Sequence, residues 1–145
     1  MVISNILIPT DFSPASWNAT QFGLELSRQN HEVRLSLLHV YPVSNSRKQV
    51  VATPVLDGVK SRMNKLAKDL TSNPEIIKNV VLSGSVEKTL IDFIKENKFD
   101  LVIVGVNSNG STNEIGSHTA SLIEKSGTPV LVVPNNPSPY GAIAS

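Results

Sequence analysis

Short apolar runs alternate along this chain with segments in which apolar residues recur at the spacing of a helix. The runs have the length of strands and occupy residues 6–8, 33–41, 76–82, 100–105 and 129–133. Strands separated by helices need right-handed crossovers, and such crossovers produce a parallel sheet with helices on both faces. We therefore predict an α/β fold built on a doubly wound, five-stranded parallel sheet.

The segments between the runs carry helix signals. Ser13 has the side chain of an N-cap, and a proline follows it at the first helical position, where its missing N–H does no harm. The apolar face of this helix is predicted to comprise Ala15, Ala19, Phe22 and Leu26. Residues 53–70 predict a second helix, and Ser85 is expected to cap a third. Ile115, Leu122 and Ile123 mark a last helix, which Gly127 is expected to end.

Length and composition exclude several classes of protein. The 145 residues suit one domain, which we place at residues 1–134 and expect to be followed by a loose tail at 135–145. Thirteen basic against twelve acidic residues leave a net charge of +1, which argues against broad electrostatic capture of nucleic acid or of a membrane. The absence of cysteine excludes disulfides, zinc–thiolate sites and thiol catalysis. Because no signal peptide or membrane-spanning run is apparent, we expect a cytoplasmic protein.

Two loops are expected to meet at the ligand-binding edge of the sheet. Doubly wound sheets bind ligands beyond the carboxyl ends of their strands, where the strand order reverses. The loops "PTDFS" and "GVNSNGSTNEIGS" follow the first and fourth strands, and neither is a P-loop or a dinucleotide fingerprint. Asp11 in the first loop suits a ribose hydroxyl, a nucleobase amine or a phosphate-bound metal. Equally, it suits the backbone N–H groups at the start of the next helix.

The second loop suits phosphate. Gly105 and Gly110 allow close approach of the backbone to a ligand, and Gly116 and Ser117 lie near a helix start, where free N–H groups favour an anion. The alternative is an ordinary turn, since the composition is also typical of one. His118 either approaches the phosphate or lies exposed on the helix. His39, inside an apolar strand, is interpreted as a hydrogen-bonded core residue rather than a base, and Trp17 as a packing or rim residue.

Three separated motifs resemble the universal stress protein (UspA-like) family. They are "ILIPTDFSPAS", "LSLLHVYPV" and "DLVIVGVNSNG…IGSHTASLIEKSGTPVLVVP", and the resemblance spans residues 3–134. It implies an adenine-nucleotide-hydrolase-like sheet with the strand order 3-2-1-4-5. It also implies a homodimer formed through the last strand, between Val130 and Val133, which suits an apolar sheet edge that needs protection.

The resemblance also implies a site for an adenine nucleotide, in which Asp11 contacts the nucleotide and the backbone of Val40 meets the adenine. The family's loop pattern is G-x2-G-x9-G-[ST]. Gly105 matches its first glycine and Gly116 its last, but they are eleven positions apart, two fewer than the pattern requires. Gly110 is the candidate for the displaced middle glycine. The nucleotide-binding residues expected are Pro9, Thr10, Asp11, Val40, Gly105, Gly110, Gly116, Ser117 and His118.

The leading hypothesis is a dimeric regulatory protein of the stress response that binds ATP or another adenine nucleotide, with Mg²⁺ held by the nucleotide and approached by Asp11. No general base is identifiable, so we expect slow hydrolysis at most. The alternative is a nucleotide-free dimeric interaction module, which the shortened loop favours. A hydrolase or ligase of the adenylating type ranks last, because no Ser-Gly-Gly-rich loop follows the first strand.

Overall fold

Strands and helices alternate through the whole described chain in the computed structural model, which describes residues 3–42, 53–73, 76–107 and 115–135. The elements in order are β1 Asn5–Pro9, α1 Pro14–Gln29, β2 Arg34–Pro42, α2 Thr53–Leu70, β3 Ile77–Gly84, α3 Val86–Asn97, β4 Leu101–Asn107, the 3-10 turn η2 Gly116–His118, α4 Thr119–Lys125 and β5 Val130–Asn135. This succession confirms the alternation predicted from the sequence.

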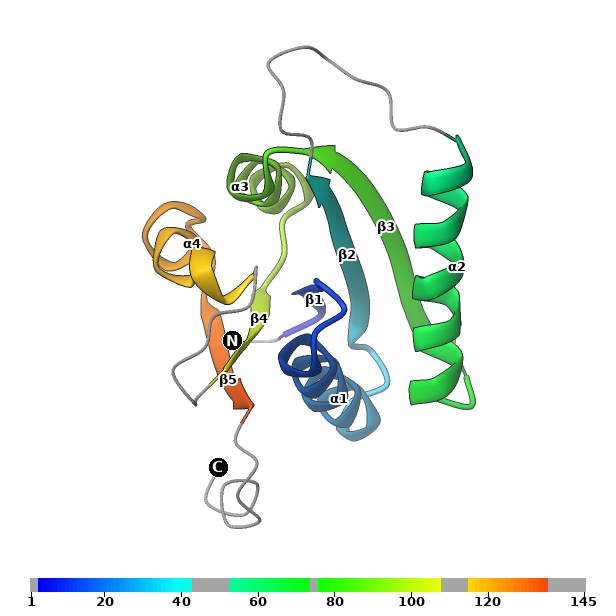
Figure 1. The fold of residues 1–145 in the computed structure, drawn as a ribbon. Helices are drawn as coiled ribbons and strands as arrows, with labels where there is room; N and C mark the ends of the chain where they lie inside the picture. The colour runs from blue at the N-terminus through cyan, green and yellow to red at the C-terminus, as the bar shows by residue number, and fades with distance from the viewer. Residues whose placement is uncertain (1–2, 43–52, 74–75, 108–114, 136–145) are drawn as a thin grey trace.

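The five strands form one parallel sheet in the order β3-β2-β1-β4-β5. This order confirms the doubly wound prediction and places β1 at the centre (Figure 1). β1 ends at Pro9, opposite Leu38, whereas β2 continues beside β3 to Pro42. The carboxyl end of β2 therefore projects beyond the end of β1 and forms one wall of an open crevice.

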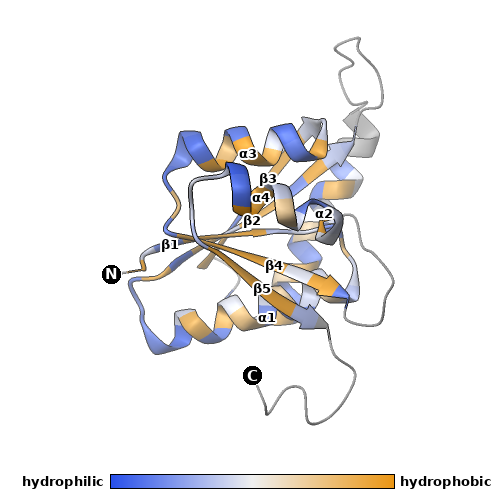
Figure 2. Ribbon diagram, turned by 90° about the vertical axis from the view of Figure 1, so that its left-hand side faces the viewer, coloured by the Kyte–Doolittle hydropathy of each residue, from blue (hydrophilic) through white to orange (hydrophobic). Residues whose placement is uncertain are grey.

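Each face of the sheet carries its own apolar layer. Figure 1 shows α1 and α2 on one side of the sheet and α3 and α4 on the other. The strands are predominantly apolar between helices whose outer faces are hydrophilic (Figure 2), as expected for strands covered on both sides. Fully buried members of the α1/α2 layer are Ile6, Ile8, Leu37, Met63 and Ile103, and those of the α3/α4 layer are Leu7, Leu38, Leu90, Ile94, Val102 and Leu122.

Helix α1 lies on the sheet through small side chains rather than through large ones. Ala15 and Ala19 are fully buried, and a Cβ added to Gly23 would lie 2.6 Å from Cδ1 of Ile8. Phe22, predicted from its spacing to belong to the buried face, is instead 37% exposed. The prediction was wrong because the i, i+4 stripe of small residues lets the helix axis approach the sheet closely and turns the larger ring outward.

The same close approach explains Gly105. We predicted that the fourth strand ends at this residue and that Gly105 opens the following loop, but β4 continues to Asn107. Gly105 is buried within the strand, and a Cβ there would overlap the carbonyl group of Ala15 and lie 3.0 Å from the amide nitrogen of Ser16. The first turn of α1 therefore packs directly on the backbone of β4, which only glycine permits.

The ends of the helices agree in part with the predicted signals. Ser13 caps α1 and accepts a hydrogen bond from the N–H of Ser16 at 3.2 Å. Ser85 occupies the N-cap position of α3, but its side chain makes no capping hydrogen bond. Gly127 follows the end of α4 with a φ of 70°, as a left-handed terminator should. Ile123, predicted as a marker of the last helix, is 57% exposed, whereas Leu122 is fully buried.

None of the described helices is both long and apolar enough to cross a membrane. β5 runs to Asn135, and the rest of the predicted tail, residues 136–145, lies outside the described residues.

Candidate functional site

The carboxyl ends of β1 and β4 lie side by side in the sheet, and the chain leaves them in opposite directions. α1 packs on one face and α4 on the other. The sheet therefore has its switch point between β1 and β4, and the crevice at such a point is where open α/β sheets bind their ligands. The loop after β1 begins at this point, and the second loop follows β4 here, but its residues 108–114, including Gly110, are outside the described residues.

The side chain of Asp11 joins the two walls of this crevice. Its Oδ1 accepts hydrogen bonds from the N–H of Ser13 at 2.9 Å and from the hydroxyl of Ser16 at 2.6 Å. Its Oδ2 accepts from the N–H of Ile115 at 3.1 Å, across 104 positions of sequence. The carboxylate thus satisfies backbone N–H groups near the helix start, as one of the two interpretations expected, and it also anchors the segment that precedes η2.

These hydrogen bonds decide the charge of Asp11. Burial raises the pKa of the carboxyl group, but the hydrogen bonds from the side chains of Ser13 and Ser16 and from the backbone of Ile115 and Ser13 outweigh burial. Together they lower the pKa from 3.8 to about 2. Asp11 is therefore a fixed negative charge at neutral pH. It suits hydroxyl or amine donors and cations, and it repels an unshielded phosphate.

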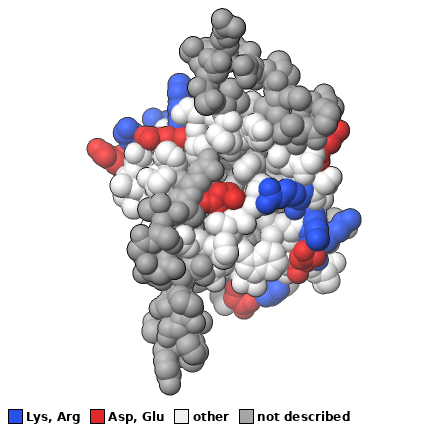
Figure 3. Space-filling view, in the orientation of Figure 1, with Lys and Arg blue, Asp and Glu red and all other residues white. Residues whose placement is uncertain are grey.

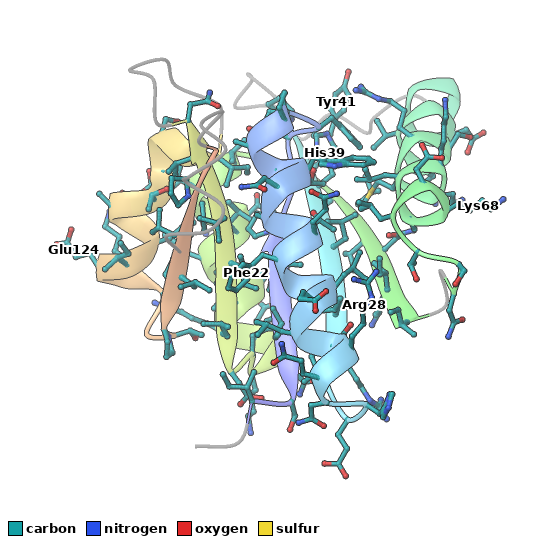
Figure 4. All side chains as sticks on the ribbon, turned by 90° about the horizontal axis from the view of Figure 1, so that it is seen from below. Phe22, Arg28, His39, Tyr41, Lys68 and Glu124 are labelled. Atoms are coloured by element: carbon teal, nitrogen blue, oxygen red, sulfur yellow. The ribbon has the colours of Figure 1, made fainter. Side chains whose placement is uncertain are left out.

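The β1 loop is held on its other side by His39. Thr10 is buried, and its N–H donates to the carbonyl of Leu38 at 2.7 Å. Nδ1 of His39 lies 2.9 Å from the carbonyl oxygen of Thr10, and the imidazole is 8% exposed. His39 is thus a hydrogen-bonded core residue, as predicted. Figure 4 labels it and Tyr41 at the end of the molecule where α1 begins.

Phe12 completes this support and was not foreseen from the sequence. Its φ of 63° is left-handed, a conformation that non-glycine residues adopt rarely. The ring is held 4.6 Å from the His39 ring, and the guanidinium of Arg62, on α2, lies 4.0 Å from its centre. No local pattern signals this arrangement, because Arg62 lies on a helix fifty positions away. The backbone turn that presents Asp11 is therefore fixed by tertiary contacts.

Val40 lies two residues beyond the last pair between β2 and β1, which joins Leu38 to Pro9. Along a parallel strand, the backbone groups of alternate residues point to the same neighbour, so those of Val40 point to the β1 side, as those of Leu38 do. The side chain of Val40 is buried in the α3/α4 layer. Val40 therefore presents its backbone groups at the place where β1 has ended.

The segment before α4 forms the other wall. Ile115 is buried, and Gly116, Ser117 and His118 form the 3-10 turn η2. His118 turns toward α3, where its Nδ1 lies 3.6 Å from Oε2 of Glu87. The structure thus brings Thr10, Asp11 and Gly116 to the crevice. It places Gly105 inside β4 and directs the imidazole of His118 to a carboxylate.

Charged groups around the crevice are mixed in sign. A pocket of about 320 Å³ lies between α1 and α2, next to the loop that follows β1. Its lining includes Thr10, Phe12, Ser13, Trp17, Arg62 and Asp69. Trp17, predicted to be a packing or rim residue, is 36% exposed and lines this pocket. Figure 3 views this side, and its visible part shows acidic and basic groups interspersed rather than gathered by sign. No cluster of three or more potential metal ligands occurs among the described residues.

Comparison with known proteins identifies the family. The model of the universal stress protein family matches residues 3–134. The chain belongs to the universal stress protein family. Universal stress protein MJ0577 from Methanocaldococcus jannaschii is 25% identical over an alignment 158 residues long, which covers 92% of this chain and 96% of that protein. A solved structure of MJ0577 covers 95% of this chain and 100% of its own, with a TM-score of 0.70.

Two further universal stress protein structures share the fold and contain nucleotides. One, solved in complex with cAMP, is 19% identical, covers 92% of this chain and 98% of its own, and has a TM-score of 0.64. The other, from Arabidopsis thaliana with AMP bound, is 18% identical, covers 96% of this chain and 98% of its own, and has a TM-score of 0.59.

Proposed function

We propose that this universal stress protein binds an adenine nucleotide, ATP or a mononucleotide, in the crevice beyond β1 and β4. The observation that carries the proposal is the bridge made by Asp11, which is ionised and ties the β1 loop to the start of η2. A ligand seated at this bridge contacts both loops at once. The cAMP and AMP complexes of structural neighbours support adenine nucleotides as the ligand class.

Different residues contact the adenine, the ribose and the phosphates of the nucleotide. The backbone of Val40 meets the edge of the adenine, with Pro9 and Thr10 beneath it. Asp11 accepts from the ribose hydroxyls or approaches Mg²⁺ carried by the phosphates. The backbone around Gly116 and Ser117, together with Gly110, holds the phosphates, because backbone N–H groups at the start of a helical segment favour an anion. Gly105 acts by letting α1 lie close to β4.

Binding, rather than turnover, is the activity we assign. His39 donates to the carbonyl of Thr10, and His118 faces Glu87, so neither imidazole is positioned as a base at the crevice. The protein is then a dimeric regulator in the stress response whose state depends on nucleotide. Its dimer forms through β5, an edge strand of the sheet on which Val132 is 37% exposed.

The test is calorimetric titration of the nucleotide-stripped protein with ATP and Mg²⁺, and then with AMP, using Asp11→Asn and a matched control. Asp100→Asn is that control: Oδ2 of Asp100 also accepts two backbone N–H groups, from Ser4 and Asn5, but at the opposite end of the sheet. We expect micromolar binding, weakened at least about tenfold by Asp11→Asn and unchanged by Asp100→Asn. Absence of heat at millimolar nucleotide, with the protein folded, refutes the proposal.

A second candidate function is a nucleotide-free dimeric interaction module. The observation that favours it is that both carboxylate oxygens of Asp11 already accept hydrogen bonds from Ser13, Ser16 and Ile115. Light scattering after size exclusion, with and without ATP, separates the two functions. A dimer that Val132→Lys dissociates and that nucleotide leaves unchanged supports the interaction module.

A further inference from the structure

A second groove lies at the opposite end of the sheet from Asp11, beneath the end of α3. It has a volume of about 520 Å³, a size usual for small-molecule sites. The lining residues that matter here are Asn5, Arg34, Ser36, Lys78, Phe93 and Phe99. They come from β1, β2, β3, α3 and the turn after α3, so the groove is a product of the tertiary fold and is separate from the proposed nucleotide site.

The floor of the groove is a polar break in an otherwise apolar face of the sheet. Leu38 and Val40 of β2 pack against α3, and alternation along the strand places Arg34 and Ser36 on the same face. The two neighbouring strands also carry polar residues at this level: Asn5 is the register partner of Arg34, and Lys78 is the register partner of Ser36. The apolar layer therefore ends where the groove begins, and polar groups of three adjacent strands face one space.

Two cations, Arg34 and Lys78, lie on this floor. Among the described residues, neither Arg34 nor Lys78 forms an ion pair. They lie on adjacent strands and are offset by two residues, which places their Cα atoms about 8 Å apart, within reach of one anion for side chains of this length. Asp100 is close in sequence to the roof, but its Oδ2 accepts from the N–H groups of Ser4 and Asn5.

Protection of a sheet edge does not account for both cations. A lysine on an edge strand prevents pairing with other chains, and β3 is an edge strand. This reason covers Lys78. It does not cover Arg34, because β2 lies inside the sheet, between β3 and β1.

The roof is aromatic. The rings of Phe93 and Phe99 lie 5.7 Å apart with an interplanar angle of 33°, and both are half-buried against the α3/α4 layer. An aromatic roof over a cationic floor is complementary to a molecule with a planar apolar part and one negative end. Arg34 adds geometric preference, since a guanidinium pairs with a carboxylate through two parallel hydrogen bonds.

We propose that this groove binds a small aromatic carboxylate, with its ring against Phe93 and Phe99 and its carboxylate between Arg34 and Lys78. His31 also lines the groove. The site is separate from the proposed nucleotide site, because its strand residues lie at the amino ends of the strands and Asp11 lies beyond the carboxyl end of β1.

The test is a titration of the ¹⁵N-labelled protein with 2-naphthoate, followed by the shifts of backbone amide signals. We expect saturable shifts confined to the amides around Asn5, Arg34, Lys78 and Phe99. Lys78→Gln and Arg34→Gln each weaken binding about tenfold. The uncharged analogue 2-naphthylmethanol binds at least about tenfold more weakly, because it lacks the carboxylate that pairs with Arg34 and Lys78.

Lys68→Gln is the matched control, because Lys68 is an exposed lysine on α2, on the other face of the sheet (Figure 4). It leaves the affinity unchanged, as does Asp11→Asn, which separates this site from the nucleotide site. The proposal is overturned if 2-naphthoate causes no saturable shift, if the shifts cluster elsewhere, or if both charge variants bind as the wild type does. A charge variant is shown to be folded when its amide signals keep the dispersion of the wild type, and one folded charge variant is enough for the comparison of affinities.

Discussion

Replacing Asp11 by asparagine tests whether the charge of its carboxylate stabilises the crevice. The substitution preserves size but removes the charge and leaves only one acceptor oxygen. If that oxygen keeps the hydrogen bonds from Ser13 and Ser16, the new amide faces the N–H of Ile115, donor against donor. The link between the β1 loop and η2 is therefore the part of the network that is lost.

The pKa of Asp11 sets the size of the stabilisation that its charge contributes. Lowering it from 3.8 in the unfolded chain to about 2 in the folded protein corresponds to at most about 2.4 kcal/mol of stability. Asp11 is only half-buried, so solvent screening reduces this to about 1 to 1.5 kcal/mol. Because the folded pKa is the lower one, the stabilisation is fully present above pH 3.8 and is lost as the pH falls toward 2.

Urea unfolding at pH 7, 4.5 and 2.5, monitored by circular dichroism, measures this effect. We expect Asp11→Asn to lower the free energy of unfolding by about 1 to 1.5 kcal/mol at pH 7, and we expect this difference to shrink by more than half at pH 2.5. A difference that stays constant across this range would show that shape, rather than charge, is lost. That result would refute the account of Asp11 as an ionised bridge.

Two further predictions concern the packing and capping that support the site. Gly105→Ala should destabilise by about 2 to 3 kcal/mol, because the new methyl group overlaps the Ala15 carbonyl. The control Gly58→Ala, in α2 with no atom within 4 Å of the new Cβ, should stabilise by about 0.5 to 1 kcal/mol. Ser13→Ala should lower stability by about 1 kcal/mol through loss of its cap, whereas Ser85→Ala, which loses no capping bond, should change it little. Thermal unfolding of the four variants checks both pairs, and equal effects within either pair would contradict the packing or capping argument.

Much of the fold was predictable from the sequence because its signals are local. The apolar runs predicted the strands to within two residues at each end, and Ser13 and Gly127 predicted helix ends that the structure confirms. The errors arose where a helix meets the sheet. Phe22 matched the helical spacing but lies outside the contact, since the close approach at Gly23 decides which side of α1 faces the core.

The candidate site was only partly predictable. The switch point and Asp11 followed from the strand order and the loop sequence, whereas the role of Gly105 did not. A glycine after a buried strand indicates either a turn or a close contact. Only the position of the Ala15 carbonyl shows that the contact is the reason here.

The sequence alone determined the order of strands and helices, the family, and the two loops at the ligand-binding edge, because periodicity, caps and motifs depend on residues close together in the chain. The tertiary structure alone decided which distant groups meet. It placed Asp11 against the N–H of Ile115, Arg62 on the ring of Phe12, and two cations under an aromatic pair. Such long-range contacts depend on strand register and on how closely the helices lie against the sheet, and no local stretch of sequence encodes either.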